Sequence, residues 1–301
     1  MTGARRSFVE MADRGALAVS GPEARPFLQG LISNDIDQVT PIQAVYAALL
    51  TPQGKFLFDF IILQLDDELL LETEQARLPQ LIQRLTMYRL RSKVELADAS
   101  GRFVSAALLG ADVAAALDLP ERAGACRALG SGVLLIDPRL VQLGGRALLP
   151  REAFPDGLTQ LGFEPASFET YDRHRLALGV PDGSRDLPIE KATLLESGFD
   201  ELRGVDFKKG CFVGQELTAR MKYRGLVRKR LMPVSFEGTP PEPGTIIRLD
   251  GRDAGEMRSS AEGIGLALLR LEQVAKAKEA GAPLLAGESA LVPSKPDWVN
   301  F

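Results

Sequence analysis

The chain has 301 residues, with 36 Lys and Arg against 40 Asp and Glu, and a formal net charge of -4. Apolar residues make up 45% and charged residues 25%, which excludes a disordered chain and is ordinary for a globular protein of about two domains. The two cysteines, Cys126 and Cys211, are too few for a disulfide scaffold or a four-thiolate metal site. Since the chain also has a single histidine, the sequence predicts no resident metal.

The most apolar runs are short. The first twenty residues contain no apolar stretch of the kind that a secretory signal needs. The run over 56–65 is too short to cross a bilayer, which takes about 20 residues. The sequence therefore predicts a cytoplasmic protein with no membrane association.

The first hundred residues have the pattern of a small α+β lobe. Alternation and turn residues predict strands over 16–19, 44–50, 55–65, 69–73 and 93–96. A capping-box spacing at 20–23 predicts a helix from there to residue 32, and helical spacing predicts another over 74–90. Residues 103–178 suggest a second lobe, with strands over 103–109, 132–136 and 146–149 and helices over 111–117, 154–161 and 166–178.

The pattern changes after Gly225. Short strands are predicted over 226–236, 245–249, 254–259 and 263–271, separated by Gly and Pro. Strands of this length and spacing are typical of a small β-barrel or sandwich. We therefore predict an α+β region over 1–225 and a C-terminal β-barrel domain over 226–301.

One segment concentrates chemically active residues. Lys208 and Lys209 precede Cys211, and a helix is predicted to begin at Gln215. Nearby ammonium groups and a helix N-terminus favour a thiolate, so Cys211 is a candidate reactive or ligand-contacting thiol. The alternative is a small, inert core cysteine, which is the commoner state of a free cysteine.

Asp59 is a second candidate. It lies within the apolar strand predicted over 55–65, with apolar neighbours on both faces. A carboxylate in such surroundings is expected to be partly buried, and burial raises its pKa unless cations or hydrogen bonds compensate. The two interpretations are a functional carboxyl group and a structural one bonded to a backbone turn.

Charge is distributed unevenly along the chain. Residues 208–230 contain eight basic residues and one acid, so this segment carries +7 and the rest of the chain -11. An anionic ligand or partner is the first interpretation, and a solvated face is the plain alternative. Nucleic-acid binding ranks lower, because the chain as a whole is acidic.

Residues 209–216 and 219–225, with their Lys-Gly-Cys and Ala-Arg-Met runs, resemble the signature of the YgfZ family. These proteins are folate-binding relatives of the glycine-cleavage T-protein and take part in iron–sulfur enzyme maturation. Residues 27–35, 46–55 and 263–270 are similar to other parts of the family. The resemblance thus covers nearly the whole chain and is weakest between about 100 and 165.

The resemblance implies an α+β folate-binding region of two lobes around a central channel, followed by a small β-barrel. It implies a tetrahydrofolate-binding accessory protein that supports assembly or repair of iron–sulfur clusters in client enzymes, including radical-SAM tRNA-modifying enzymes. The partners would be folate and iron–sulfur client or assembly proteins. The implied catalytic residues are Cys211 and Asp59. The implied cofactor-binding residues are Asp59, Lys209, Gly210, Gln215, Glu216, Arg220 and Arg224.

A second function is a tetrahydrofolate-dependent aminomethyl or one-carbon transferase of the T-protein type. Three positions depart from the T-protein pattern: Phe58 and Cys211 replace acids, and Leu178 replaces a glutamate. These departures favour the accessory role. Arg175, on the helix predicted over 166–178, is expected to be a solvated charge, with an anionic ligand group as the alternative.

Overall fold

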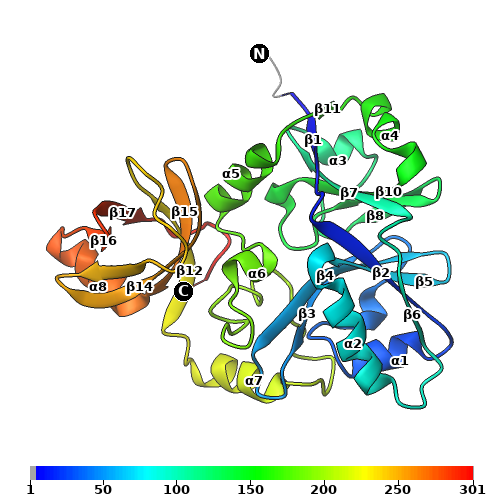
Figure 1. The fold of residues 1–301 in the computed structure, drawn as a ribbon, viewed down its shortest axis with the longest axis horizontal. Helices are drawn as coiled ribbons and strands as arrows, with labels where there is room; N and C mark the ends of the chain where they lie inside the picture. The colour runs from blue at the N-terminus through cyan, green and yellow to red at the C-terminus, as the bar shows by residue number, and fades with distance from the viewer. Residues whose placement is uncertain (1–4, 301) are drawn as a thin grey trace. The chain divides into compact units, whose positions relative to one another are not determined.

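The computed structural model describes residues 5–300 and divides the chain into two compact units (Figure 1). The first unit comprises residues 5–50, 57–171 and 202–213. The second comprises residues 51–56, 172–201 and 214–300. Both units are discontinuous in sequence, because the chain leaves the first unit and returns to it before the barrel begins.

The first unit contains a five-stranded antiparallel sheet with the strand order β3-β4-β5-β2-β6. Its strands are β2 (Arg14–Ser20), β3 (Val45–Leu50), β4 (Phe56–Leu65), β5 (Glu68–Glu74) and β6 (Glu95–Asp98). Helices α1 (Ala24–Gln29) and α2 (Leu78–Arg89) cover one face, where Leu28 and Leu81 join a core with Leu17 and Phe60. The alternation along β4 places Phe58 and Phe60 in this core, so Asp59 lies on the opposite face.

A six-stranded sheet with the order β11-β1-β7-β10-β9-β8 completes the first unit. Its strands are β1 (Ser7–Glu10), β7 (Phe103–Leu109), β8 (Cys126–Leu129), β9 (Gly132–Ile136), β10 (Gly145–Pro150) and β11 (Glu164–Pro165). Helices α3 (Val113–Ala116) and α4 (Asp156–Gln160) pack on it through Val113 and Leu158. The sequence missed β1, β8 and β11, because four residues or fewer give too short a pattern to recognise.

The second unit contains a closed barrel with the strand order β12-β15-β14-β13-β16-β17. Its elements are β12 (Lys229–Ser235), β13 (Ile246–Leu249), β14 (Arg252–Ala261), β15 (Ile264–Arg270), α8 (Leu271–Ala280), β16 (Leu284–Ala286) and β17 (Ser289–Pro293). The predicted barrel is confirmed, although α8 and the last two strands were not predicted. The division at residue 225 stays a prediction.

Three further helices complete the fold. They are α5 (Phe168–Leu178), α6 (Gly183–Asp186) and α7 (Gln215–Arg224). Short 3-10 turns lie over Ile36–Gln38, Gln75–Arg77, Val141–Leu143 and Arg151–Ala153. The helix predicted from the capping box is shorter than expected: α1 begins at Ala24, and the Glu23 carboxylate accepts a hydrogen bond of 2.8 Å from the Lys93 amide instead of capping the helix.

Candidate functional site

Asp59 is buried on β4 and is 2% exposed, as the alternation of this strand indicated. Its Oδ2 accepts a hydrogen bond of 2.8 Å from the hydroxyl of Tyr46, which is on the adjacent strand β3. Its Oδ1 is also buried and has no hydrogen-bond partner among the described residues. A buried polar atom without a partner is uncommon in proteins and is a typical mark of a site that receives a ligand.

Burial raises the pKa of Asp59 above its usual value of 3.8. The guanidinium of Arg14 opposes this shift, as does the hydrogen bond from Tyr46, but neither outweighs the loss of hydration. Asp59 therefore keeps a proton to a higher pH than an exposed aspartate does. Such a carboxyl group can donate or accept a hydrogen bond, according to its protonation state.

A buried ion-pair network joins the two sheets of the first unit. Glu72 of β5 pairs with Arg14 at 2.9 Å and with Arg146 of β10 at 3.2 Å. Asp137 pairs with Arg146 and with Arg139, each at 2.8 Å. Sequence reasoning missed this network, because its members come from separate strands and no local motif marks them.

The pKa values within this network follow from the same pairs. Burial alone would raise the pKa of Glu72, but Arg14 and Arg146 outweigh it and hold the pKa below 4.5. Arg139 and Arg146 likewise hold the pKa of Asp137 well below its usual value, against the effect of burial. Both carboxylates therefore stay ionised at neutral pH and fix the surrounding guanidinium groups in place.

The segment that precedes α7 is anchored by Lys209. Its ammonium donates three hydrogen bonds to main-chain carbonyl oxygens, those of Gln29 at 2.8 Å, Ile32 at 2.6 Å and Asn34 at 2.7 Å. Burial lowers the pKa of Lys209 to about 8, while nearby carboxylates raise it, so the ammonium form predominates at neutral pH. The amide of Val213 also donates to the carbonyl of Gly30, at 3.1 Å. All three ammonium donors are used, so Lys209 acts as an anchor for this loop.

Asn34 joins the anchored loop to the Asp59 region. Its side-chain amide donates at 2.7 Å to the carbonyl of Tyr46 and at 2.7 Å to that of Arg203, while its own carbonyl accepts from Lys209. A short chain of hydrogen bonds therefore leads from Lys209 through Asn34 to the residue that holds Asp59. The family resemblance covers the motif at 33–35 but assigns it no role.

Cys211 is exposed and Cys126 is buried. The exposure of Cys211 differs from the alternative of an inert core thiol. Gly210, just before it, has a φ of 94°, a conformation that favours glycine, and a Cβ added there would meet nothing within 4 Å. Gly210 is thus required by the backbone conformation of the loop. Burial raises the pKa of the Cys126 thiol to about 11, in agreement with a structural role.

The remaining signature residues lie on α7, in the second unit. Gln215 begins the helix and Arg224 ends it. Glu216 and Arg220 form an exposed ion pair one helical turn apart. Arg224 is exposed at the C-terminal end, beside Tyr223, which is 75% exposed. The helix thus presents basic and aromatic side chains to solvent.

Two departures from the T-protein pattern have structural explanations. Phe58 is buried in the core beneath α2, with the guanidinium of Arg77 at 4.2 Å from the ring centroid. Arg175 is fully buried, so the predicted solvated charge is wrong. It donates to Asp172 at 2.7 Å and to Ser259 at 2.7 Å and pairs with Asp186. Partners far along the chain offset the cost of its burial.

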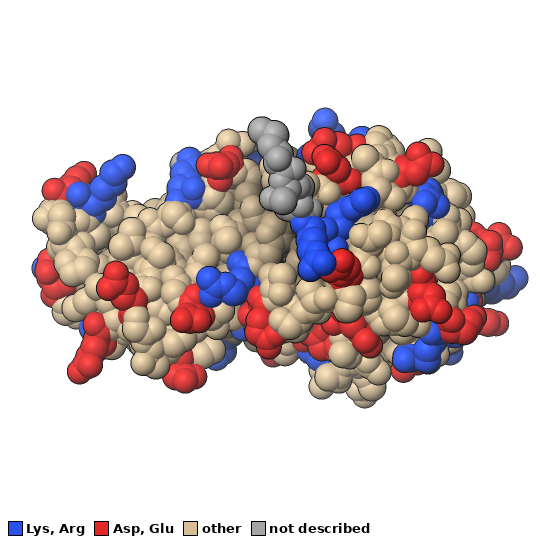
Figure 2. Space-filling view, turned by 90° about the horizontal axis from the view of Figure 1, so that it is seen from above, with Lys and Arg blue, Asp and Glu red and all other residues tan. Residues whose placement is uncertain are grey.

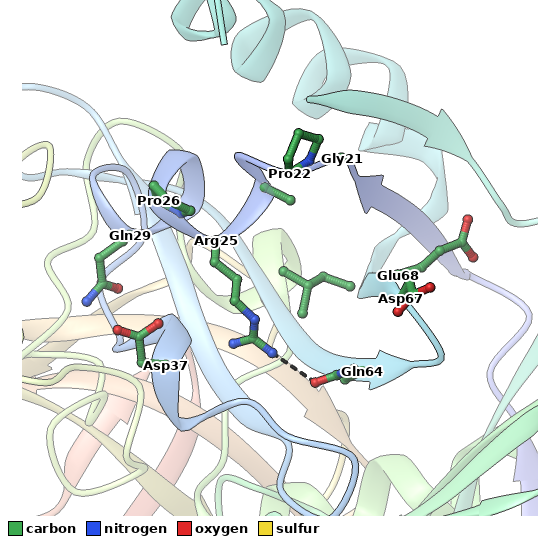
Figure 3. A pocket seen from close by; sticks show the side chains of 11 residues that line it. Gly21, Pro22, Arg25, Pro26, Gln29, Asp37, Gln64, Asp67 and Glu68 are labelled. Atoms are coloured by element: carbon green, nitrogen blue, oxygen red, sulfur yellow. Dashed lines mark hydrogen bonds between the residues drawn. The ribbon is translucent and has the colours of Figure 1, made fainter. Parts of the chain in front are cut away.

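A cavity of about 580 Å³ lies beside α1 (Figure 3). Arg25 extends into it and donates to Gln64 at 2.8 Å, as well as to the carbonyls of Ile36 and Val39. The cation of this cavity is therefore already committed to the protein. On the face shown in Figure 2, acidic and basic side chains are interspersed.

The described ranges also restrict two other kinds of site. Among residues 5–300, no helix combines the length and apolarity that crossing a bilayer requires. In the same part of the chain, no three His, Cys, Asp or Glu side chains are arranged to hold a metal ion.

Two protein families match separate parts of the chain. The GCVT N-terminal domain matches residues 4–121, and the CAF17 C-terminal β-barrel domain matches residues 228–301. The crystal structure of glycine cleavage system aminomethyltransferase T from Bartonella henselae superposes with a TM-score of 0.78 at 17% identity, covering 99% of this chain and 87% of that one. The fold is therefore a GcvT-like α+β fold with a CAF17-type barrel, as the sequence predicted.

Longer relatives define the family further. The mitochondrial iron–sulfur cluster assembly factor IBA57 of Homo sapiens is 36% identical, over 98% of this chain and 86% of the relative. The corresponding protein of Mus musculus is 35% identical, over 95% and 83%. That of Mycosarcoma maydis is 34% identical, over 87% and 73%. The chain belongs to the IBA57 family of iron–sulfur cluster assembly factors.

These relatives refine one prediction and correct another. They carry the name IBA57 and not YgfZ, so the shared GcvT-like ancestry is supported while the narrower assignment to YgfZ is not. Their names also place them in mitochondria. The prediction of a cytoplasmic location is therefore wrong, because its basis, the absence of a secretory signal, does not distinguish the cytoplasm from an organelle.

Proposed function

We propose that the protein supports the assembly or repair of iron–sulfur clusters, and that Cys211 is the group it offers to a cluster-carrying partner. The observation that carries this proposal is an exposed thiol on a loop that Lys209 fixes through three hydrogen bonds. Clusters are usually held by four thiolates, and Cys211 can supply one. The cluster is thus cargo shared with a partner, which provides the other ligands.

Two other roles for the thiol remain within this proposal. Cys211 could act as a redox group or carry a one-carbon unit, since an exposed cysteine is accessible to both kinds of chemistry. The family name and the mitochondrial relatives support an assembly role and iron–sulfur partner proteins. Radical-SAM tRNA-modifying enzymes are the clients that we propose to test.

The test is complementation in cells that lack their own homologue. Wild type, Cys211→Ala and Cys126→Ala are expressed at equal levels, and the activity of a radical-SAM tRNA methylthiolase is measured. We expect wild type and Cys126→Ala to restore this activity and Cys211→Ala to fail. Full restoration by Cys211→Ala would show that the thiol has no part in the function.

We propose tetrahydrofolate as the ligand of the Asp59 region. The buried Oδ1 of Asp59 has no partner among the described residues, so the region fits a ligand that brings a hydrogen-bond donor. Bound there, tetrahydrofolate would supply a one-carbon carrier. Asp59 would orient it and hold a proton at its carboxyl group, and Tyr46 would position Asp59. The signature residues Gly210, Gln215, Glu216, Arg220 and Arg224 stay in the proposed ligand set, while we propose a positioning role for Lys209.

Titration with tetrahydrofolate tests this ligand. We expect saturable binding by wild type and by the control Asp67→Asn, which changes an exposed carboxylate. Asp59→Asn should bind at least about tenfold more weakly, which corresponds to about 1.4 kcal/mol. Equal binding by Asp59→Asn and wild type would make Asp59 a structural residue.

The second candidate function is an aminomethyl transferase that uses tetrahydrofolate. The raised pKa of Asp59 favours it, because a carboxyl group that titrates closer to neutral pH is suited to proton transfer. Phe58 weighs against it, because a core aromatic ring stands in place of the adjacent acid. A turnover assay with an aminomethylated lipoyl carrier distinguishes the two functions, since only the transferase releases the amine.

A further inference from the structure

A second cavity, of about 450 Å³, lies entirely within the unit that contains the barrel. Three parts of the chain line it: Lys55 in the turn before β4, the segment over 186–197, and the barrel strands β12, β14 and β15. Its size lies within the range of small-molecule sites, which is roughly 300 to 1,000 Å³. No function discussed above uses it.

Four cationic side chains line this cavity: Lys55, Lys191, Lys229 and Arg258. Arg258 is 8% exposed, and its hydrogen bonds within the described residues all come from Nη1, which pairs with Glu256 and donates to the Met257 carbonyl at 3.5 Å. A guanidinium group has five N–H donors, so several donors of this buried side chain are left for a ligand.

The acidic residues of the lining are already paired. Asp186 binds Arg175 and accepts from the amide of Ser259 at 2.9 Å. Glu256 binds Arg258, and Glu196 accepts from the hydroxyl of Thr193 at 2.8 Å. These contacts satisfy the carboxylates from within the protein and leave the lysines as the open charges.

The lysines lack such partners. Within residues 5–300, the ammonium groups of Lys55 and Lys191 make no hydrogen bond or ion pair. Lys229 has a weak electrostatic interaction with Asp253. Ammonium and guanidinium groups that converge on one cavity attract phosphate and carboxylate groups, and Arg258 supplies the directional donors.

We propose that this cavity binds a small organic anion, through a phosphate or carboxylate group held by Arg258, Lys55 and Lys229. The site is independent of the iron–sulfur and folate proposals, because Cys211 and Asp59 belong to the other compact unit. Its occupant is a metabolite of a size that a 450 Å³ cavity encloses. The bound anion neutralises the unpaired lysines and adds stability to this unit.

The test is calorimetric titration of the full chain with pyrophosphate, glycerol 3-phosphate and citrate at constant ionic strength, with chloride as the reference salt. We expect saturable binding of at least one of these anions with a Kd below about 1 mM. The double variant Lys55→Gln/Lys229→Gln should weaken that binding at least tenfold. Lys278→Gln, an exposed lysine on α8 of the same unit, is the matched control and should leave it unchanged.

Arg258→Lys gives a second measurement that keeps the charge of the buried position. It should weaken binding while circular dichroism stays native, because the ammonium cannot reproduce the fork of the guanidinium. A preference for the phosphate compounds or for citrate identifies the anionic group, and either result supports the site. The proposal is overturned if none of the anions saturates, or if Lys278→Gln reduces binding as much as the double variant does. Neither result would bear on Cys211 complementation.

Discussion

The hydroxyl of Tyr46 donates a hydrogen bond of 2.8 Å to Oδ2 of Asp59, while Oδ1 of the same carboxyl group is buried and has no partner among the described residues. The carboxyl group is thus held from one side only. It is positioned without being neutralised, which suits a group that waits for a ligand. The arrangement also makes Asp59 a cost to the stability of the folded protein.

The first prediction concerns that cost. Burial raises the pKa of Asp59 in the folded protein, so the free energy of unfolding falls as the pH rises from 3.8 through the folded pKa. Asp59→Asn should therefore be more stable than wild type at pH 7, by about 1.4 kcal/mol for every pH unit by which the folded pKa exceeds 3.8. The difference should disappear below pH 3.8. Urea unfolding at pH 7 and pH 3 measures it, and a less stable Asn variant at pH 7 would contradict the argument.

The ion-pair network between the sheets predicts a different pH dependence. Because the pKa values of Glu72 and Asp137 are lowered in the folded state, their contribution is complete above their usual values of 4.5 and 3.8. It is lost as the pH falls through the folded pKa values. Arg146→Met should cost about 3–5 kcal/mol at pH 7, because it leaves two buried carboxylates undercompensated. Its stability should also depend less on pH below 4.5 than that of wild type does.

Arg102→Met is the matched control for this prediction. Arg102 pairs with Glu68 at 2.8 Å at a partly exposed position, where ion pairs are worth about 1 kcal/mol or less. Denaturant unfolding of both variants at several pH values compares the two environments. Equal losses for Arg146→Met and Arg102→Met would mean that the buried network contributes no more than a surface pair.

Thiol chemistry provides the third prediction. With a pKa of about 11 and a buried side chain, Cys126 has about one thiolate in a thousand molecules at pH 8. Cys211 is exposed, so iodoacetamide should alkylate it at least about tenfold faster. Mass spectrometry of the two peptides over time measures both rates, and denatured protein, in which both thiols are accessible, is the control. Comparable rates in the native protein would contradict the assigned environments.

Lys209 gives the fourth prediction. Lys209→Met removes three hydrogen bonds to the carbonyls of Gln29, Ile32 and Asn34 and should lower the free energy of unfolding by about 2–3 kcal/mol. Amide hydrogen exchange over 207–213 should become at least tenfold faster, since the loop loses its anchor. Lys208→Met changes the adjacent exposed lysine and should leave both quantities near those of wild type. Unaltered exchange in Lys209→Met would show that other contacts hold the loop.

Sequence patterns could predict what local spacing determines. The alternation along β4 indicated that Asp59 would be buried, and the spacing after Gly225 indicated the barrel. The role of Lys209 could not be predicted, because its three acceptors lie 175 to 180 positions earlier in the chain. Arg175 was wrongly expected at the surface for the same reason, since Ser259 is 84 positions away. Contacts between distant residues decide both cases, and no local period records them.

The burial of Arg175 has a consequence for how such proteins can be divided or recombined. Asp186 receives both Arg175 and the main-chain amide of Ser259, so a strand of the barrel depends on an acid that precedes the barrel in sequence. A fragment beginning at residue 226 would contain all six strands but would leave that amide and hydroxyl without their acceptor. The barrel is therefore not a portable cassette. A chimera that exchanges it for the barrel of a relative must bring the segment over 172–186 along with it.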